Sequence, residues 1–328
     1  RRMLAFPPPR RDGSPARKGN TRQVLRRLDF IWVAIGLSVA IVAYLALVPL
    51  GFLLWQSFFT PATVSKAAEF TWDNYQVAYG SAETAQLFLN SLYYATGSSL
   101  LAFVVGTVLA WMNERTNTPF KRLFFALSVI PLIIPGILFT VSWIFLGSPK
   151  IGLINKVLQY LFDTQYVFVN VYSVWGMIWV DGLHYSPMAF LLMTAAFRSM
   201  DPSLEESAMM SGATVLQTAW RVTLKLAWPA IFATLLILFV RALESFEVPA
   251  LLGLPAGINV FTSAIYQAIH EYPSRIGLAC AYGVTLLVIT MFGIWLQHRL
   301  TGHGSKYSTI TGKGFRPRVI DIGGWKYV

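Results

Sequence analysis

Residues 198–228, RSMDPSLEESAMMSGATVLQTAWRVTLKLAW, separate two strongly apolar stretches, and their pattern decides how the rest of the chain is interpreted. Asp201 suits the N-cap of a first short helix, and Gly212 suits the left-handed residue that ends it. Thr214 and Gln217 have the T-x-x-Q spacing of a capping box for a second helix. The segment is therefore predicted to form a compact helix–turn–helix rather than a simple connection.

The segments on both sides of this element are apolar over lengths that suit membrane helices. A helix needs about 20 apolar residues to cross a bilayer, and six segments of the chain meet this length. The chain is therefore predicted to be an all-α membrane protein with six transmembrane helices and the helix–turn–helix between spans four and five. The predicted spans are Phe30–Trp55, Leu87–Met112, Leu123–Leu146, Tyr172–Phe197, Pro229–Leu252 and Gly277–Gln297.

The composition agrees with a membrane location. Charged residues make up 12% of the 328 residues, where ordinary globular proteins carry about 25%, and the mean hydropathy is +0.55. So few charges do not cover the surface of a soluble protein with this apolar content, and the same composition excludes a disordered chain. The net charge of +11 is concentrated near the two ends, which indicates membrane topology rather than nucleic-acid binding.

The distribution of Lys and Arg predicts which side of the membrane each segment faces. With both termini inside, the inner segments hold 21 of the 26 Lys and Arg residues, and the outer segments hold four. Because cytoplasmic loops carry the excess of positive charge, both termini are predicted to be cytoplasmic. The predicted organisation is a basic cytoplasmic tail (residues 1–29), a transmembrane domain (residues 30–300) and a cytoplasmic tail or linker (residues 301–328).

Two outer segments carry helical patterns of their own. Residues 150–162 place apolar side chains on one helical face. This suits either a helix on the membrane surface or a loop that packs on the outer helix ends. Residues 260–272 are expected to form a second short helix that ends before Pro273.

The chain lacks the motifs of several enzyme classes. It has no G-x-x-x-x-G-K-[ST] phosphate-binding loop, so it is not expected to hydrolyse ATP. Its four histidines show no metal-binding spacing, and its one cysteine, Cys280, lies in an apolar run. The chain is therefore expected to be a non-enzymatic subunit with no cofactor and no metal of its own.

Four charges fall inside the predicted spans, where an ionised side chain costs about 2.5–3.5 kcal/mol on insertion scales. Arg241 and Glu244 are three residues apart and suit mutual pairing on one helix face. Glu247 is the better candidate for a polar pathway or gate. Asp181 suits an interhelical hydrogen bond more than a substrate contact. All four are candidate pathway or gate residues.

The loop resembles the cytoplasmic signature of permease subunits of binding-protein-dependent ABC importers. That signature is Glu-Ala-Ala, three residues, Gly, nine residues, then Ile-x-Leu-Pro. The chain has Glu206-Ser207-Ala208, then Gly212, then Val222-Thr223-Leu224-Lys225, and the resemblance covers about residues 85–300. Lys225 departs from the usual proline, which puts the bend after the second helix in question. The coupling residues implied by the resemblance are Glu205, Glu206, Ser207, Ala208, Gly212, Ala213, Val222 and Leu224.

This resemblance implies a type I importer fold, in which the chain is one permease half in a prokaryotic inner membrane. It also implies a cytoplasmic ABC ATPase dimer that uses the ATP, a second permease half and an extracytoplasmic substrate-binding protein. Besides these the lipid bilayer is the expected partner, and no nucleic acid. Residues 244–267, ESFEVPALLGLPAGINVFTSAIYQ, look like the iron(III), polyamine and phosphonate branch. The alternative function is a secondary, ion-coupled transporter.

The C-terminal segment after the last span, residues 306–328, leaves two interpretations open. Its basic and aromatic residues resemble the connector of double-length permeases, in which one half leads into the next. In the other interpretation, a half-size subunit rests a basic tail on anionic headgroups. The second permease half is therefore the same chain, a paralogue or a fused segment.

Overall fold

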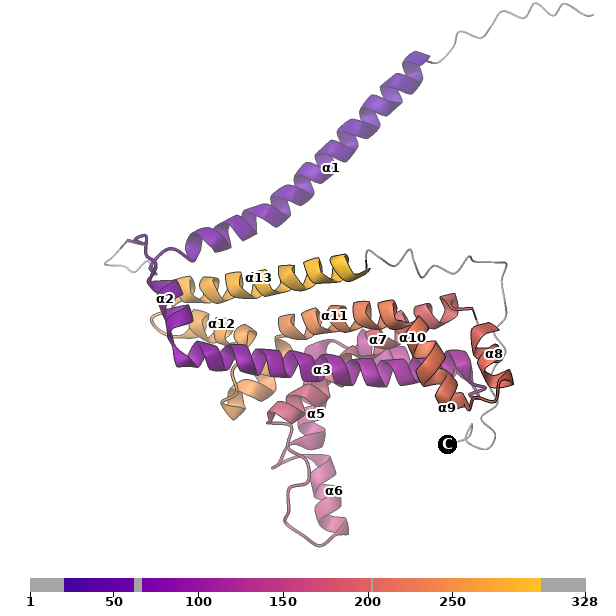
Figure 1. Ribbon diagram of the computed structural model, residues 1–328. Coiled ribbons are helices and arrows are strands. Elements are labelled where there is room, and N and C mark those ends of the chain that lie inside the picture. The colour runs from indigo at the N-terminus through magenta and orange to yellow at the C-terminus, as the bar shows by residue number, and fades with distance from the viewer. Residues whose placement is uncertain (1–20, 62–66, 202, 302–328) are drawn as a thin grey trace, which may run out of the picture. The chain divides into compact units, whose positions relative to one another are not determined.

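The structure is a computed structural model that describes residues 21–61, 67–201 and 203–301 (Figure 1). The tails at residues 1–20 and 302–328 lie outside the described residues. The regular secondary structure of the described residues is helical, apart from one isolated bridge between Phe59 and Phe70. Its elements are α1 (Thr21–Gln56), α2 (Asp73–Gly80), α3 (Ala82–Arg115), α4 (Lys121–Ile133), α5 (Gly136–Gly147), α6 (Leu153–Leu161), α7 (Val174–Ser199), α8 (Ser203–Met210), α9 (Val215–Thr218), η1 (Ala219–Thr223), α10 (Leu224–Leu226), α11 (Trp228–Glu244), η2 (Pro249–Gly253), η3 (Leu254–Ala256), α12 (Phe261–His270) and α13 (Ile276–Thr301).

The chain divides into two units, residues 1–52 and residues 53–328. The first unit contains most of α1, which agrees with the predicted first span. The second unit is a helix bundle in which α3, α7, α11 and α13 run side by side (Figure 1).

The centre of the bundle is the close packing of α3 along α7. A Cβ atom at Gly106 of α3 would lie 2.5 Å from Ala189 Cβ and 2.5 Å from the Ser186 carbonyl oxygen of α7. Only glycine therefore allows this approach of the two backbones. Fully buried side chains of α7, including Phe190 and Met193, fill the core beside it.

Three helices of the described chain are long and apolar enough to cross a membrane alone, and three bent helix pairs bring the possible number to six. The single helices lie within α1, α3 and α13, and the bent pairs are α4–α5, α9–α11 and η2–α12. The predicted fourth span, α7, is not among them. Although α7 has 26 residues, Asp181, His184 and Arg198 lower its apolar content. The set of candidate spans therefore differs in this respect from the predicted one.

The predicted third span, Leu123–Leu146, is not one helix. It is broken into α4 and α5, whose axes differ by 99°. Pro131 stays inside α4, whereas Pro135 lies at the break. Ile134 has the extended ψ of 127° that is favoured before a proline, and Pro135 lacks the N–H that a continuous helix needs. Pro135 therefore redirects the chain.

The predicted fifth span, Pro229–Leu252, also ends early. Helix α11 stops at Glu244 because Ser245 takes an extended conformation with ψ of 129°, and a π-helical turn begins at Pro249. Both segments with helical patterns contain a short helix, α6 and α12. In α6 the buried Asn155 donates to the carbonyl oxygens of Ser148 and Val169, which fastens the helix to its own loop.

Candidate functional site

The helix–turn–helix predicted at residues 198–228 is present as α8 followed by α9, η1 and α10. Gly212 follows α8 in the left-handed region with a φ of 88°. Its N–H donates to the Met209 carbonyl at 3.0 Å, and the Ala213 N–H donates to the Ala208 carbonyl at 3.1 Å. These two bonds form a Schellman motif. No atom lies within 4 Å of a Cβ built at Gly212, so the backbone conformation is what requires glycine.

The predicted caps on both arms are confirmed. The Asp201 carboxylate accepts from the Ser203 N–H at 2.9 Å at the start of α8. The Thr214 hydroxyl accepts from the Gln217 N–H at 3.3 Å, and the Gln217 amide oxygen accepts from the Thr214 N–H at 3.0 Å. Local sequence therefore determines both helix starts.

The second arm bends by 74° where it meets α11. Lys225 stands where the family signature has proline, but the bend is present. Pro229 lies in the first turn of α11 and has no N–H to donate to the carbonyl of Lys225. Pro229 therefore supplies the bend, four residues after the position at which the family signature has its proline.

The inner side of this element holds a buried ionic network that sequence analysis did not predict. Glu205 was expected among the coupling residues, but its side chain points inward and is 6% exposed. Its Oε2 lies 3.4 Å from Arg115 Nε, and its Oε1 accepts from the Thr223 hydroxyl at 2.8 Å. Arg115, 3% exposed, also donates to the Phe197 carbonyl at 2.9 Å. Arg115 follows the predicted second span and lies 90 residues before Glu205, so no local sequence pattern indicated this contact.

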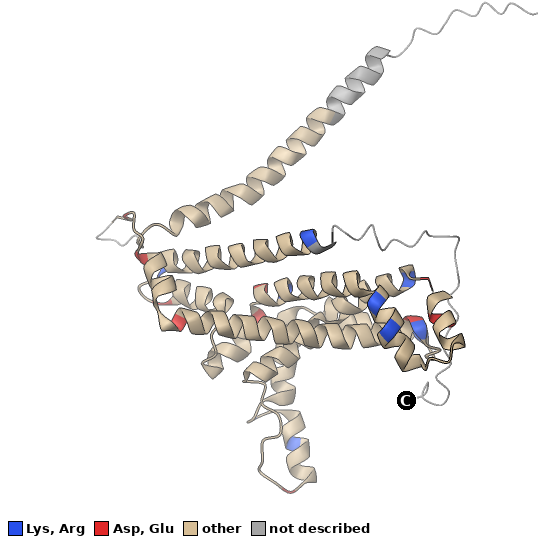
Figure 2. Cartoon of the chain, viewed as in Figure 1, with Lys and Arg blue, Asp and Glu red and all other residues tan. Residues whose placement is uncertain are grey.

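The outer side of the same element exposes apolar side chains. Met210 is 90% exposed, and Leu204 and Leu216 are also exposed. The remaining predicted coupling residues divide into exposed positions, Ser207 and Gly212, and half-buried ones: Glu206, Ala208, Ala213, Val222 and Leu224. Lys and Arg gather at this end of the bundle (Figure 2). The helix–turn–helix therefore exposes an apolar tip, and Lys and Arg residues lie near it.

A second polar site lies where α11 is interrupted. The Ser245 hydroxyl donates to Asp181 Oδ1 of α7 at 2.9 Å and accepts from the Tyr94 hydroxyl of α3 at 3.3 Å. The Ser245 carbonyl accepts from the Thr262 hydroxyl at 2.9 Å. Asp181 is 1% exposed, so the predicted interhelical hydrogen bond is confirmed. Ser245 holds the interruption in place against two helices.

The other intramembrane charges lie on an exposed face. Arg241 Nη1 is 3.9 Å from Glu244 Oε2, so the predicted pair is present, and both side chains are exposed. Glu247 is exposed as well. A Cβ atom at Gly136, the first residue of α5, would lie 3.4 Å from Glu247 Cδ and 3.5 Å from His184 Nε2. The breaks in the third and fifth predicted spans therefore face each other, with Glu247 between them.

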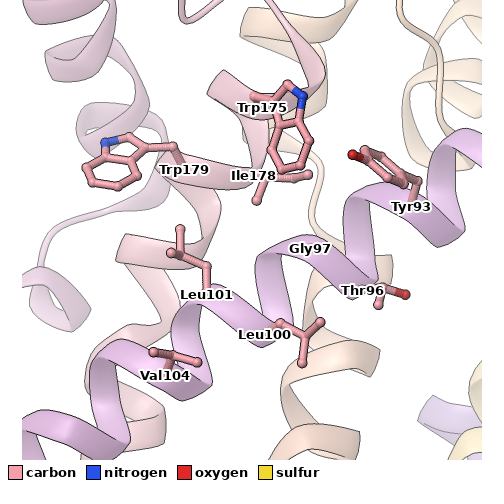
Figure 3. Close-up of a pocket in the computed structure, with 9 residues that line it drawn as sticks. All are labelled: Tyr93, Thr96, Gly97, Leu100, Leu101, Val104, Trp175, Ile178 and Trp179. Atoms are coloured by element: carbon pink, nitrogen blue, oxygen red, sulfur yellow. The ribbon is translucent and has the colours of Figure 1, made fainter.

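A cavity of about 620 Å³ lies elsewhere, between α3 and α7 (Figure 3). Tyr93 and Trp175 are in edge-to-face contact at its rim, with ring centroids 5.7 Å apart. None of its lining residues carries a charge, so it offers mainly hydrocarbon contact. The residues are Tyr93, Thr96, Gly97, Leu100, Leu101, Val104, Trp175, Ile178 and Trp179. Within the described ranges, no three His, Cys, Asp or Glu side chains are grouped to hold a metal ion.

The family described as "Binding-protein-dependent transport system inner membrane component" matches residues 102–302. The ferric transport system permease protein FbpB of Actinobacillus pleuropneumoniae is 28% identical over 255 residues, which cover 76% of this chain and 36% of that protein. A putative ferric permease of Haemophilus influenzae is 27% identical, over 74% of this chain and 38% of its own length. The chain thus spans little more than a third of the length of these two relatives.

The fold is also found in a crystal structure of a bacterial ABC transporter involved in the import of the acidic polysaccharide alginate. One of its chains superposes with a TM-score of 0.67 at 23% identity, covering 86% of this chain and all of that one. The matched family segment contains the whole helix–turn–helix, so the resemblance inferred from residues 206–225 is confirmed. The chain belongs to the family of binding-protein-dependent transport system inner membrane components.

Proposed function

We propose that this chain is one permease half of an ATP-driven importer and that the α8–α10 element is its contact with a cytoplasmic ATPase. The observation that carries the proposal is the geometry of this element. A Schellman turn at Gly212 and a capping box at Thr214 hold two short helices rigidly, and their tip exposes Met210 and Leu216. A flexible apolar side chain such as methionine suits a groove on a partner protein.

The proposed topology has six spans with α8–α10 and both termini on the cytoplasmic side. The cations at the α8–α10 end support this orientation (Figure 2), because cytoplasmic segments carry the excess of Lys and Arg. In this topology α7 is the fourth span, since it lies at the centre of the bundle beside α3. A membrane-impermeant maleimide tests the orientation on single cysteines in a Cys280→Ser background. It should label Tyr272→Cys in spheroplasts and Met210→Cys only in inside-out vesicles.

The exposed face of α11 is proposed to line the pathway shared with a second permease half. Arg241 and Glu244 are exposed on α11, and Glu247 is exposed in the segment that follows it. Each charge would cost about 2.5–3.5 kcal/mol at the centre of a lipid-facing helix, so water or a polar partner is the favoured neighbour. The second half is the same chain, a paralogue or a fused segment.

Iron(III) is the proposed substrate. The names of the two ferric permeases support it, as do the exposed carboxylates of Glu244 and Glu247, because hard cations prefer oxygen ligands. In this proposal a soluble binding protein delivers the iron on the outer side. The partner ATPase supplies the energy.

Transport in proteoliposomes tests the whole proposal. The chain is reconstituted with its second half, an ATPase and a binding protein, and the uptake of radioactive iron(III) is measured. Uptake should require internal ATP and should persist when ionophores collapse the ion gradients. Uptake that follows an ion gradient and ignores ATP would favour a secondary transporter. Polyamine or phosphonate uptake without iron uptake would contradict the substrate.

A further inference from the structure

The buried network beneath the helix–turn–helix joins four elements at one ion pair. Arg115 ends α3, and its guanidinium donates to the carbonyl of Phe197 in α7 at 2.9 Å. The same group lies 3.4 Å from the carboxylate of Glu205 in α8. Thr223 of η1 donates to the other oxygen of that carboxylate at 2.8 Å. Both arms of the helix–turn–helix are thus bound to two long helices of the bundle.

Burial makes this contact stiff. Arg115 and Glu205 are almost completely removed from solvent, where neither charge has water as an alternative partner. Moving the loop away from α3 would leave a buried carboxylate and a buried guanidinium uncompensated. By contrast, the Arg198–Glu114 pair at the same end leaves Arg198 60% exposed, so water readily replaces that contact.

The rigid contact continues into the bundle. Helices α3 and α7 are in backbone contact at Gly106, where a Cβ would lie 2.6 Å from the Phe190 nitrogen. On α7, Asp181 accepts the hydrogen bond of Ser245, which holds the interrupted end of α11. A displacement of α8 would therefore reach the segment that bears Glu247 through packed groups without a flexible joint.

We propose that Arg115, Glu205 and Thr223 are positioning residues that make the coupling loop a rigid extension of α3 and α7. In this arrangement the loop does not hinge on the bundle when a bound ATPase moves it. The movement passes as a unit to the helices of the pathway. This inference rests on the proposed function, since it specifies how that contact transmits force.

The first test compares matched variants in the reconstituted transporter. Glu205→Gln removes the charge but keeps the shape, and Thr223→Val removes one hydrogen bond, whereas Thr223→Ser retains it. Glu271→Gln is the control, because it breaks the exposed pair with Arg275 outside the network. We expect Glu205→Gln to lower the iron taken up per ATP hydrolysed about tenfold. Thr223→Val should lower it less, and Thr223→Ser and Glu271→Gln should match the wild type.

The ratio of uptake to hydrolysis separates positioning from a structural role. A purely structural role would reduce the amount of assembled complex and leave this ratio unchanged in the complex that remains. An unchanged ratio in Glu205→Gln and Thr223→Val would therefore overturn the proposal. Co-purification of the ATPase measures assembly in the same preparations.

A second test measures the rigidity itself. Spin labels are placed at Ser203→Cys on α8 and Val108→Cys on α3, two exposed positions outside the residues proposed for the ATPase contact, in a Cys280→Ser background. We expect a narrow distance distribution that is the same in the nucleotide-free and ATP-trapped transporter, and a broader one when Glu205→Gln is added. A nucleotide-dependent shift in the otherwise wild-type complex would show a hinge and contradict the proposal.

The two proposals fail in different ways. The width of the spin-label distance distribution can be compared with and without Glu205→Gln in the absence of an ATPase. This comparison therefore measures the rigidity of the loop even if the partner is not an ATPase. If no ATPase co-purifies and wild-type uptake ignores ATP, the proposed function is wrong. The other outcome is that uptake depends on ATP while Glu205→Gln leaves two quantities at their wild-type values: the width of the distance distribution and the iron taken up per ATP hydrolysed. In that case only the rigid-extension inference is wrong.

Discussion

The Ser245 hydroxyl donates a hydrogen bond of 2.9 Å to the buried carboxylate of Asp181. This contact joins the extended residue that ends α11 to the first third of α7. The same hydroxyl accepts from Tyr94 of α3, so one small side chain ties the interruption to both central helices. Because Glu247 lies two residues further on, this bond sets where the proposed pathway residue is presented.

Ser245→Ala should destabilise the protein. The substitution leaves Asp181 Oδ1 without its donor in a buried site, a loss of about 1–3 kcal/mol. The melting temperature of the detergent-solubilised protein should therefore fall. Ser142→Ala is the matched control, because the Ser142 hydroxyl bonds only to the Leu138 carbonyl of its own helix and is exposed. Equal melting temperatures for the two variants would show that the contact with Asp181 contributes nothing.

Gly212→Val should separate ATP hydrolysis from transport. Gly212 has a φ of 88°, and a branched side chain in the left-handed region costs roughly 1–2 kcal/mol, so the tip of the loop should change shape. Gly257→Val is the control, because Gly257 has a φ of 70° with nothing within 4 Å of its Cβ but lies outside the loop. Normal uptake per ATP in Gly212→Val would mean that this loop is not the coupling element.

Gly106→Ala should destabilise the contact between α3 and α7. The added Cβ would lie 2.5 Å from Ala189 Cβ and from the Ser186 carbonyl oxygen, and overpacking of this kind costs about 1–3 kcal/mol. A lower melting temperature and a lower yield of folded protein are expected. Gly80→Ala, at a site with nothing within 4 Å, should leave both at wild-type values. Similar yields and melting temperatures for both variants would contradict the close approach.

Glu247→Gln should reduce iron(III) uptake and leave assembly with the ATPase intact. The substitution removes a negative charge from the exposed face between the two helix breaks, where the proposed cation passes. Uptake should fall severalfold while the ATPase still co-purifies. Glu83→Gln, in the first turn of α3, removes an exposed charge outside this face and should have no effect on uptake. Wild-type iron uptake in Glu247→Gln would assign Glu247 a structural role.

Local features of the loop were predictable because their causes are local. Asp201, Thr214 and Gln217 bond to backbone groups two or three residues away, and Gly212 ends the helix it directly follows. The short helix α12 lies where a local pattern indicated one, whereas the pattern of residues 150–162 left a surface helix and a packed loop equally open before the structure showed α6. The sequence signature in residues 206–225 was enough to indicate the family before the fold was known.

The helix breaks were only partly predictable. Pro131, Pro135 and Pro187 look alike in the sequence, yet only Pro135 ends a helix, and the others remain inside α4 and α7. Ser245 gives no break signal at all, because a serine is ordinary in a helix. Its extended conformation depends on Asp181, Tyr94 and Thr262, which come from three other segments.

The sequence by itself determined the helical class and the capped turn of the loop, since periodicity and capping depend on neighbouring residues. Only the tertiary structure decided that Glu205 turns inward to Arg115, and that Gly136 approaches Glu247. Both pairs join residues that are far apart in the chain. Which residues meet depends on how the helices pack, and local sequence patterns do not show that packing.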